Sequence, residues 1–450
     1  MITHPNIDSP TTFEQRCIEA SCSAAYSIGE RIYVCPRCGG LLDIEAQYSQ
    51  QPDAETLKRL WLNRKQSFVE SDISGVWRFR DMLPFTTDVV PVSLREGNTP
   101  LYDAPRSATY CQIDSLQLKH QGANPTGSFK DTGMTVAVTQ AVRLGARLVA
   151  CASTGNTAAS LAAYAARANL ACAIMVPTGQ ISHAKLAQAL DYGAKVLEIE
   201  GNFDSCMREI RILSDDGSLY LVNSINPFRI EGQKTVAFEL AEQMNWQVPD
   251  HLVVPGGNLG NSSALGKGFR ELHALGLVER MPRISVVQAA GAAPFARYFS
   301  EDRKSEFQDE ANPQTLASAI KIGAPVSWKK ALRAVDETSG QVLTVTEHEI
   351  ADAKVIIGRD GIGCEPASAT TVAGIRKLQA SDFIKGSETV VALLTGHVLK
   401  DTDYVNKYHN DSLKAEGVGA ISGSYRNPPV RVSGGLDELR SVLRQLASET

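Results

Sequence analysis

A glycine-rich turn, Pro-Gly-Gly-Asn-Leu-Gly-Asn at residues 255–261, follows an apolar segment and precedes a segment with helical periodicity. Glycines let successive backbone N–H groups converge, and the N-terminus of a helix adds positive potential, so such a turn can bind a phosphate group. The turn lacks G-x-G-x-x-G spacing and an acidic residue placed for a ribose, which argues against a dinucleotide. A simple tight turn between strand and helix is the alternative. The candidate phosphate ligands are Gly256, Gly257, Asn258, Leu259, Gly260 and Asn261.

A lysine stands at the start of a second predicted helix, in the segment Asn-Pro-Thr-Gly-Ser-Phe-Lys-Asp at residues 124–131. We expect Ser128 to cap this helix and Lys130 to lie in its first turn. The positive end of the helix dipole favours the neutral form of an amine there, and a neutral amine is what Schiff-base chemistry requires. The alternative is a solvated surface lysine.

Two more polar turns follow apolar segments. Residues 153–157 gather hydroxyls, an amide and backbone N–H groups at a helix N-terminus, which suits a carboxylate ligand; an ordinary helix cap is the alternative. Thr395 ends the last apolar strand, where its hydroxyl can hydrogen-bond a ring nitrogen, or where the chain simply turns. The residues of the first turn are Ser153, Thr154, Gly155, Asn156 and Thr157.

A second anion site is predicted after the strand at residues 219–223. Ser224, Asn226 and Arg229 follow that strand, and arginine binds phosphate with its planar fork of N–H groups. Lys185 is a further candidate cation. For each of these residues, the alternative is a surface pair or a helix cap.

Four cysteines near the N-terminus, Cys17, Cys22, Cys35 and Cys38, are spaced C-x4-C-x12-C-x2-C. A proline inside the second pair and two glycines after it let backbone amides turn toward thiolates, as in zinc knuckles. The pattern indicates a small zinc ribbon, with a ribbon without metal or thiols that merely pack as alternatives. Because the stretch has few basic residues, we interpret it as a structural or interaction element and not as a nucleic-acid reader.

The composition excludes several classes of protein. A chain of 450 residues that is 43% hydrophobic can form two or three domains. Its net charge of −5 argues against broad nucleic-acid binding. No apolar run reaches membrane-spanning length and no secretory signal is visible, so we expect a cytoplasmic protein without a membrane partner. Five scattered cysteines are typical of reduced core residues: Cys111, Cys151, Cys172, Cys206 and Cys364.

Strand and helix patterns alternate over most of the chain. Such alternation is typical of parallel sheets covered by helices on both faces. Two α/β lobes with a ligand between them are therefore expected, and ligands in such sheets lie at the carboxyl ends of strands, where the candidate residues fall. The predicted strands are 147–153, 171–177, 195–200, 219–223, 251–255, 283–288 and 389–395. The predicted helices are 55–68, 156–168, 182–192, 203–213 and 262–275.

Together these motifs resemble the fold-type II pyridoxal-phosphate (PLP) enzymes, and most closely the threonine synthase family. The resemblance covers about residues 96–401 and includes Glu-Gly-Asn-Thr-Pro-Leu at 96–101 and Thr-Gly-His-Val-Leu-Lys-Asp at 395–401. Val398 stands where a glycine is expected. The resemblance implies a two-lobed homodimer with open parallel sheets covered by helices and a small zinc-ribbon-like β segment. The implied limits are 1–50 for the ribbon, 51–135 with 230–450 for the large PLP-binding domain, and 136–229 for the small domain.

Roles for the candidate residues also follow from the resemblance. It implies that Lys130 carries PLP and acts in catalysis, that Asn156 contacts the O3′ atom of the cofactor, and that residues 256–261 hold its phosphate. Thr395 would face the ring nitrogen. A hydroxyl cannot hold that nitrogen protonated as a carboxylate would, which favours β- and γ-eliminations over transamination. Residues 153–157 would bind the substrate carboxylate.

The implied reaction is γ-elimination of phosphate from O-phospho-L-homoserine and β-addition of water, which gives L-threonine. Residues 223–233, Asn-Ser-Ile-Asn-Pro-Phe-Arg-Ile-Glu-Gly-Gln, also resemble the threonine synthase family. The second anion site predicted above, which includes Arg229, would then bind the substrate phosphate. Cysteate synthase (phosphoserine plus sulfite), serine/threonine dehydratase and diaminopropionate lyase share the same cradle and remain alternatives. A further alternative is a binding or regulatory module without activity, against which the presence of Lys130 argues.

Overall fold

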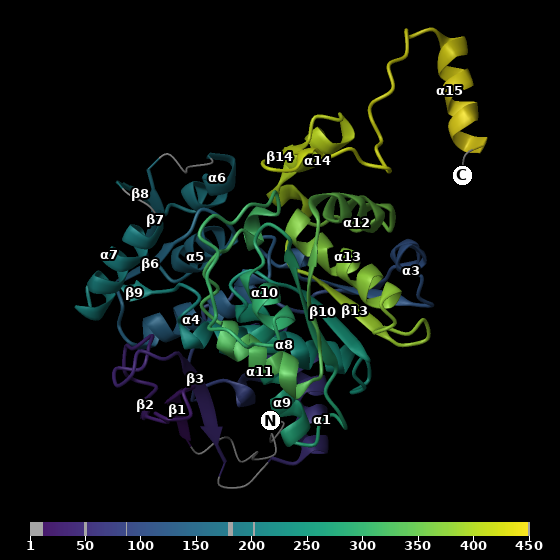
Figure 1. Ribbon diagram of the computed structural model, residues 1–450. Coiled ribbons are helices and arrows are strands. Elements are labelled where there is room, and N and C mark those ends of the chain that lie inside the picture. Colours follow the sequence, from purple (N-terminus) through teal and green to yellow (C-terminus); the bar gives the residue numbers. More distant parts are fainter. Residues whose placement is uncertain (1–11, 49–51, 87, 179–182, 201–202, 449–450) are drawn as a thin grey trace.

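Two helix-covered sheets and a small N-terminal ribbon make up the protein (Figure 1). The computed structural model describes residues 12–48, 52–86, 88–178, 183–200 and 203–448. The α/β fold class predicted from the alternation of strands and helices is confirmed. In the described part of the chain, no helix is both long and apolar enough to cross a membrane.

The larger sheet has six strands in the order β12-β11-β10-β13-β5-β4. All neighbouring strands are parallel except β4 and β5, where Leu101 lies opposite Lys119 in an antiparallel pair. The sheet is thus parallel, as predicted, except for one antiparallel pair at this edge. A short edge strand need not follow the parallel order, because no crossover helix encloses it. The strands are β4 (Leu101–Asp103), β5 (Leu116–His120), β10 (His251–Pro255), β11 (Arg283–Ala289), β12 (Val342–Val345) and β13 (Val390–Leu394).

The helices that accompany the larger sheet come mostly from the second half of the chain (Figure 1). They bury apolar side chains against the strands, and α13 packs on four of them. Their bounds are α3 (Pro105–Cys111), α8 (Pro227–Gln243), α9 (Gly260–Ala274), α10 (Pro294–Ser300), α11 (Trp328–Glu337), α12 (Glu347–Arg359) and α13 (Pro366–Ala380). Short 3-10 turns are η2 (Gln121–Ala123), η3 (Ser318–Ile320) and η4 (Val398–Lys400).

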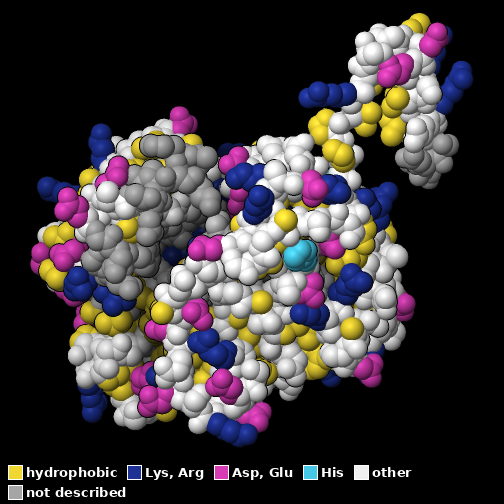
Figure 2. Space-filling model, turned by 45° about the horizontal axis from the view of Figure 1, so that its top comes forward, with side chains coloured by type: hydrophobic (Ala, Val, Ile, Leu, Met, Phe, Trp, Pro, Cys, Tyr) yellow, Lys and Arg dark blue, Asp and Glu magenta, His cyan; other side chains and the backbone are white. Residues whose placement is uncertain are grey.

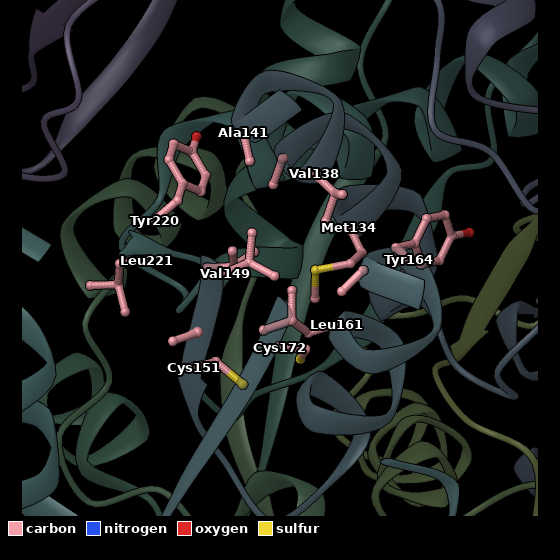
Figure 3. Packing of buried hydrophobic residues seen from close by; sticks show 14 of the residues in the cluster. Met134, Val138, Ala141, Val149, Cys151, Leu161, Tyr164, Cys172, Tyr220 and Leu221 are labelled. Carbon is pink, nitrogen blue, oxygen red and sulfur yellow. The ribbon is translucent and has the colours of Figure 1, made fainter. Parts of the chain in front are cut away.

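The smaller sheet has four parallel strands in the order β8-β7-β6-β9. Its core is apolar: Met134 and Val138 lie beside Val149, Leu161 and the aromatic ring of Tyr164 (Figure 3). The strands are β6 (Leu148–Ala152), β7 (Ala171–Pro177), β8 (Lys195–Ile199) and β9 (Tyr220–Leu221). The helices are α4 (Lys130–Arg143), α5 (Asn156–Arg167), α6 (His183–Asp191) and α7 (Phe203–Asp215). Helix α4 runs across the boundary predicted between residues 135 and 136. The domain limits stay a prediction.

Helices α4 and α8 cross at unusually short range, because a glycine lies at the crossing. A Cβ atom on Gly232 would lie 1.9 Å from the Thr132 carbonyl oxygen, so no larger residue fits there. The close crossing sets the start of α4, with Lys130, beside the first turn of α8, with Arg229. Electrostatic coupling between these two cations follows from this packing.

The N-terminal ribbon is a three-stranded antiparallel sheet of order β2-β1-β3. It contains β1 (Thr12–Cys17), β2 (Ala25–Ser27) and β3 (Leu42–Gln47), and α1 (Ala54–Lys65), α2 (Glu70–Ile73) and η1 (Trp77–Met82) connect it to the rest of the chain. At the other end are α14 (Thr402–His409), β14 (Lys414–Ala415), β15 (Gly419–Ala420) and α15 (Leu436–Ser448). Helix α15 stands apart from the body of the protein (Figure 2).

Candidate active site

Lys130 is the first residue of α4, and its loop is fixed to the end of β13. Ser128 forms a β-bridge with Gly396, and the Phe129 amide donates to the Thr395 carbonyl over 2.9 Å. Phe129, and not Ser128, is the N-cap residue, so the predicted cap is wrong. The bridge holds Ser128 in place, and its hydroxyl accepts only a long hydrogen bond of 3.4 Å from the Lys130 amide. The same bridge brings Lys130 and Thr395 into one site.

The amine of Lys130 has no acidic partner among the described residues, and its Nζ atom lies 3.9 Å from the centre of the Phe129 ring. Burial and the nearby cation of Arg229 together lower the pKa of Lys130 to about 7, while Glu365 opposes the change. A solvated surface lysine would keep a pKa near 10.5. The surroundings therefore favour a neutral, reactive amine near neutral pH.

Glu365 links two predicted site residues that come from the two sheets, Asn156 after β6 and Thr395 after β13. The Asn156 side-chain amide donates to Glu365 Oε2 over 3.0 Å, and the Thr395 hydroxyl donates to Glu365 Oε1 over 3.3 Å. Thr395 also shares a 3.1 Å hydrogen bond with the Ser368 hydroxyl. Burial raises the pKa of Glu365, although Asn156 and the cations of Lys130 and Lys400 oppose the change. The site thus contains a carboxyl group that responds to the charge of Lys130.

The turn at residues 256–261 presents unused donors. The backbone amides of residues 257–262 have no acceptor among the described residues, and neither has the side-chain amide nitrogen of Asn261, which is buried. Leu259 adopts a left-handed conformation (φ 64°) before the first turn of α9. Gly256 is closely surrounded, since a Cβ atom there would lie 2.7 Å from Val286 Cγ1. Converging donors at a helix N-terminus form a ready anion site.

The turn at residues 153–157 leads into α5 without a side-chain cap, because Gly155 is the N-cap residue. Ser153 accepts a 3.2 Å hydrogen bond from the Gly155 amide, and the Thr157 hydroxyl has no partner among the described residues. The structure therefore lacks a side-chain cap at the start of α5, where an ordinary helix cap was the alternative interpretation. Asn156 is the first residue of the helix, on the side that faces Glu365.

Arg229 is buried and has no ion pair with any described acidic residue. Its Nη1 atom donates to the Val222 carbonyl over 3.4 Å, and its Nε atom has no acceptor. Burial lowers the pKa of Arg229 to about 10, a value at which the group is still charged at neutral pH. A buried arginine without a counterion is costly unless an anion binds beside it.

The other members of the predicted second anion site differ in what they do. Asn226 caps α8, accepting from the Phe228 amide over 3.0 Å and donating to the Leu221 carbonyl over 2.8 Å. These bonds make Asn226 a helix cap, which was the alternative, and its role as a phosphate ligand stays a prediction. Ser224 is partly exposed and leaves its hydroxyl available. The side chain of Lys185 lies outside the described residues.

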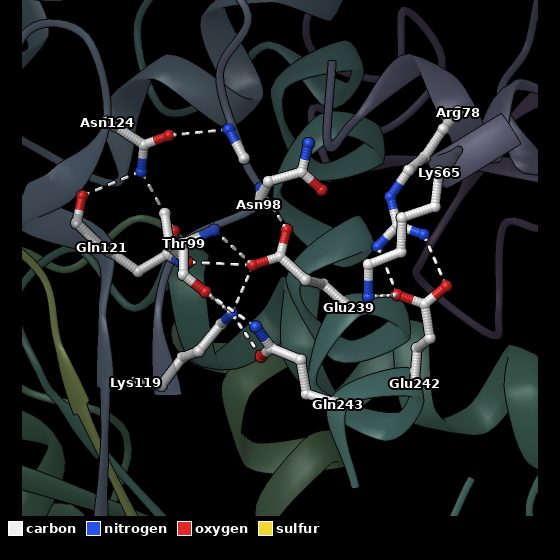
Figure 4. A network of polar contacts seen from close by, with 11 residues as sticks. Lys65, Arg78, Asn98, Thr99, Lys119, Gln121, Asn124, Glu239, Glu242 and Gln243 are labelled. Carbon is white, nitrogen blue, oxygen red and sulfur yellow. Dashed lines mark hydrogen bonds and ion pairs between the residues drawn. The ribbon is translucent and has the colours of Figure 1, made fainter. Parts of the chain in front are cut away.

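The turn at residues 96–99 positions the lysine loop and does not enter the site. The Asn98 and Thr99 amides donate to the Glu239 carboxylate over 2.6 and 2.7 Å, and Lys119 forms a buried ion pair with the same carboxylate (Figure 4). Asn124 then accepts a 2.9 Å hydrogen bond from the Gly97 amide. Because Asn124 begins the segment that ends at Lys130, this network fixes where that segment starts.

Three residues of the site went unrecognised in the sequence. Asp131 accepts from the hydroxyls of Thr126 and Ser160 over 2.6 Å each, and burial raises its pKa to about 6 despite these bonds. Lys400 contacts Gln188 of α6. It thereby connects the part of the protein built on the larger sheet with the part built on the smaller sheet. Glu365 carries no local pattern, whereas Asp131 directly follows Lys130 and Lys400 lies in the motif at residues 395–401, so both were open to recognition.

Comparisons with known proteins agree with this geometry. A family model described as "Pyridoxal-phosphate dependent enzyme" matches residues 92–396. A threonine synthase of Methanocaldococcus jannaschii is 45% identical over 403 residues, which cover 89% of this chain and 96% of that protein. Another, of Methanosarcina acetivorans, is 46% identical over 395 residues, which cover 87% of this chain and 93% of that protein.

A solved structure gives the same result for the fold. The crystal structure of a fungal L-serine ammonia-lyase from Rhizomucor miehei matches with a TM-score of 0.60 at 18% identity, and the match covers 72% of this chain and 100% of that chain. At this identity the likeness concerns the fold alone. By the matched family model and the two threonine synthase relatives, the chain belongs to the threonine synthase family of pyridoxal-phosphate-dependent enzymes.

Proposed function

We propose that the protein is a threonine synthase, which releases phosphate from O-phospho-L-homoserine and adds water to give L-threonine. The observation that carries the proposal is the pairing of Lys130, an amine with a lowered pKa, with Arg229, a buried cation that has no acidic partner. A phosphorylated amino acid needs both groups. The 45% identity to a threonine synthase over most of both chains supports the choice of substrate.

The residues present fit PLP. The unused amides of residues 257–262 and the orphaned side-chain amide of Asn261 suit the cofactor phosphate. Lys130 would hold the cofactor covalently, Asn156 would donate to its ring oxygen, and the Thr395 hydroxyl would face its ring nitrogen. When bound, PLP supplies a sink for the negative charge that develops on the carbons of the substrate.

Lys130 would move the substrate protons. A group with a pKa of about 7 is protonated and neutral in comparable amounts near neutral pH, so it can remove the α-proton and later return a proton. Arg229 lies close enough to influence that pKa, and it would stay charged throughout. We therefore assign proton transfer to Lys130 alone and charge neutralisation to Arg229.

Arg229 would hold the substrate phosphate and neutralise its growing charge as it leaves. Ser224 and Lys185 are the proposed further ligands of that phosphate. The first turn of α5 would hold the substrate carboxylate through the amides and hydroxyls of residues 153–157, with Ser153, Thr154, Gly155 and Thr157 as ligands. These two anion sites would orient the substrate with its α-carbon toward Lys130.

Purified protein loaded with PLP tests the proposal when it is incubated with O-phospho-L-homoserine, and separately with phosphoserine plus sulfite. We expect phosphate and L-threonine from the first substrate and no cysteate from the second pair. Consumption of the second pair alone would make the protein a cysteate synthase and overturn the assignment. Lys130→Ala should lose both activity and the visible absorption of bound PLP, whereas Lys321→Ala, at an exposed position, should keep both.

We also propose that the enzyme works as a homodimer in the cytoplasm. The support is the resemblance to the threonine synthase family and the reduced state of the four core cysteines whose side chains are described, Cys111, Cys151, Cys172 and Cys364; the side chain of Cys206 lies outside the described part. Light scattering on the eluting protein measures the mass. A single species at the mass of one chain would contradict the dimer.

A further inference from the structure

The four N-terminal cysteines converge in a way that disulfide bonds do not explain. All four sulfur atoms lie within 4.8 Å of one another, with Cys17 and Cys38 3.4 Å apart and Cys22 and Cys35 3.7 Å apart. All four are free thiols. Four sulfurs around a zinc ion at about 2.3 Å would be roughly 3.8 Å from one another, since they form the corners of a tetrahedron. The spacing in the protein is close to that value.

Backbone amides surround the same sulfurs. The amides of Glu19 and Ala24 turn toward Cys17 and Cys22, and those of Arg37 and Cys38 turn toward Cys35. Each bond spans two or three residues, which is the pattern of a zinc knuckle.

Two residues with a left-handed backbone conformation make these tight turns possible. Gly39 has φ 74°, and Ser23 has φ 48°, so a serine serves in the first knuckle where no glycine is present. Gly40 admits no side chain, because a Cβ atom there would lie 3.2 Å from the Cys17 sulfur and 2.7 Å from Glu19 Cγ. The Tyr26 hydroxyl adds a 3.3 Å contact to the sulfur of Cys35.

We propose that Cys17, Cys22, Cys35 and Cys38 bind one structural zinc ion, and that the metal-bound ribbon holds the PLP phosphate loop in place through α11. Each thiol releases its proton to solvent as its sulfur binds the ion. No thiol is oxidised, and no other reactant is required. The ion has no role in the reaction itself, since its ligands belong to the ribbon.

A continuous set of contacts leads from the ribbon to the phosphate loop. Asp43 of β3 forms ion pairs of 2.9 Å with both Lys330 and Arg333 of α11. Lys330 also donates to the Leu42 carbonyl over 2.6 Å, and Glu19, between the first two cysteines, pairs with Lys329. Burial would raise the pKa of Asp43, but the three cations around it outweigh burial and hold the pKa below its usual range.

Helix α11 begins at the phosphate loop. The Val326 amide donates to the Asn258 side-chain oxygen over 3.2 Å, and the Ser327 amide donates to the Asn258 carbonyl over 3.2 Å. Ser327 is the N-cap residue of α11, so the position of the helix sets that of Asn258. The ribbon therefore holds the first two turns of α11, and the start of the same helix holds the loop.

Elemental analysis of the full-length protein, purified without chelators, tests the metal site independently of activity. We expect about one zinc per chain and no iron. Zinc content should fall to near zero in Cys35→Ser and in Cys38→Ser, and stay unchanged in Cys172→Ala, which alters a buried cysteine of the smaller sheet. If the serine variants do not fold, cobalt(II) added to metal-free wild-type protein should give the absorption of tetrahedral thiolate coordination. Protein that contains no zinc and binds none, or that contains iron instead, overturns the proposal.

The link to the phosphate loop is tested with Asp43→Asn, with Glu45→Gln as the matched control on the same strand. Glu45 is exposed, and among the described residues its ion pair is with Arg16 of the ribbon. We expect Asp43→Asn to keep its zinc but to bind PLP roughly tenfold more weakly, and Glu45→Gln to bind PLP as the wild type does. The PLP affinity of both variants is measured by titration with PLP at a temperature below their melting temperatures. Unchanged PLP affinity in Asp43→Asn would overturn the link and leave the zinc result standing on its own.

Discussion

The carboxylate of Glu365 accepts a hydrogen bond from the side-chain amide of Asn156 over 3.0 Å, across 209 residues of sequence. The two residues begin or precede helices of different halves of the protein, α5 and α13. Glu365 also meets the Thr395 hydroxyl, so one carboxyl group contacts both residues that would touch the PLP ring. This arrangement couples the ring contacts to the charge state of Lys130, and the coupling has measurable consequences.

The rate at which PLP-free protein combines with PLP should depend on pH around neutrality. Only the neutral amine of Lys130 can attack an aldehyde, and burial lowers its pKa to about 7. Below that pH the amine is protonated and capture is slow; as pH rises through it, the rate should increase and then level off. The visible absorption of bound PLP follows the reaction. A rate that keeps rising toward the ordinary lysine value near 10.5 would contradict the assigned surroundings.

Glu365→Gln should move that midpoint to lower pH. The Glu365 carboxylate favours the charged form of Lys130, so a neutral amide in its place makes the amine easier to deprotonate. Glutamine can still accept from Asn156, so PLP should still bind. The measurement is the capture rate against pH, with Glu347→Gln as the control because Glu347 is buried at the start of α12. A midpoint that stays in place would remove Glu365 from the electrostatics of the site.

Much of the sheet structure was predictable because buried parallel strands are continuous apolar runs. β7 and β10 span the predicted residues, 171–177 and 251–255. β5 was missed, since its sequence Leu-Gln-Leu-Lys-His contains a lysine that is buried in the fold. Lys119 can be buried only because Glu239, 120 residues away, pairs with it. Local patterns cannot contain such a partner.

The site shows the same limit. The turns at residues 153–157 and 256–261 were recognisable from glycines and small polar residues after apolar strands. Glu365 was not, because a single glutamate before a proline has no chemistry-specific spacing, and only the fold brings it to Asn156. Asn226 was assigned to phosphate binding from the same kind of pattern that makes a helix cap, and the structure uses it as a cap.

Arg229→Gln should weaken substrate binding and leave PLP content unchanged. A charged hydrogen bond to phosphate contributes about 1.5–3 kcal/mol, so KM for O-phospho-L-homoserine should rise about tenfold or more. Arg229 also lowers the pKa of Lys130, so the midpoint of PLP capture should move to higher pH, opposite to Glu365→Gln. Steady-state kinetics and capture rates measure the two effects.

Thermal unfolding of the same Arg229→Gln variant provides an independent check. Because a buried cation without a partner destabilises the unliganded fold, its removal should not lower the melting temperature. Arg270→Gln is the control, since Arg270 is partly exposed and pairs with Glu337 at the surface. An unchanged KM would place the substrate phosphate elsewhere, with Lys400 as the next cation to test.

Gly256→Ala should weaken PLP binding through packing alone. A Cβ atom at this position would lie 2.7 Å from Val286 Cγ1 and 2.8 Å from Gln288 Cγ, so the strand and the loop must separate. Since the loop amides would share one bound phosphate, displacement of Gly256 should disturb several of them together, and PLP affinity should fall about tenfold or more. Gly358→Ala is the control, because nothing lies within 4 Å of its Cβ position in α12 and alanine there should stabilise the helix by about 0.5–1 kcal/mol. If both variants bind PLP as tightly as the wild type, the turn at residues 256–261 does not hold the cofactor phosphate.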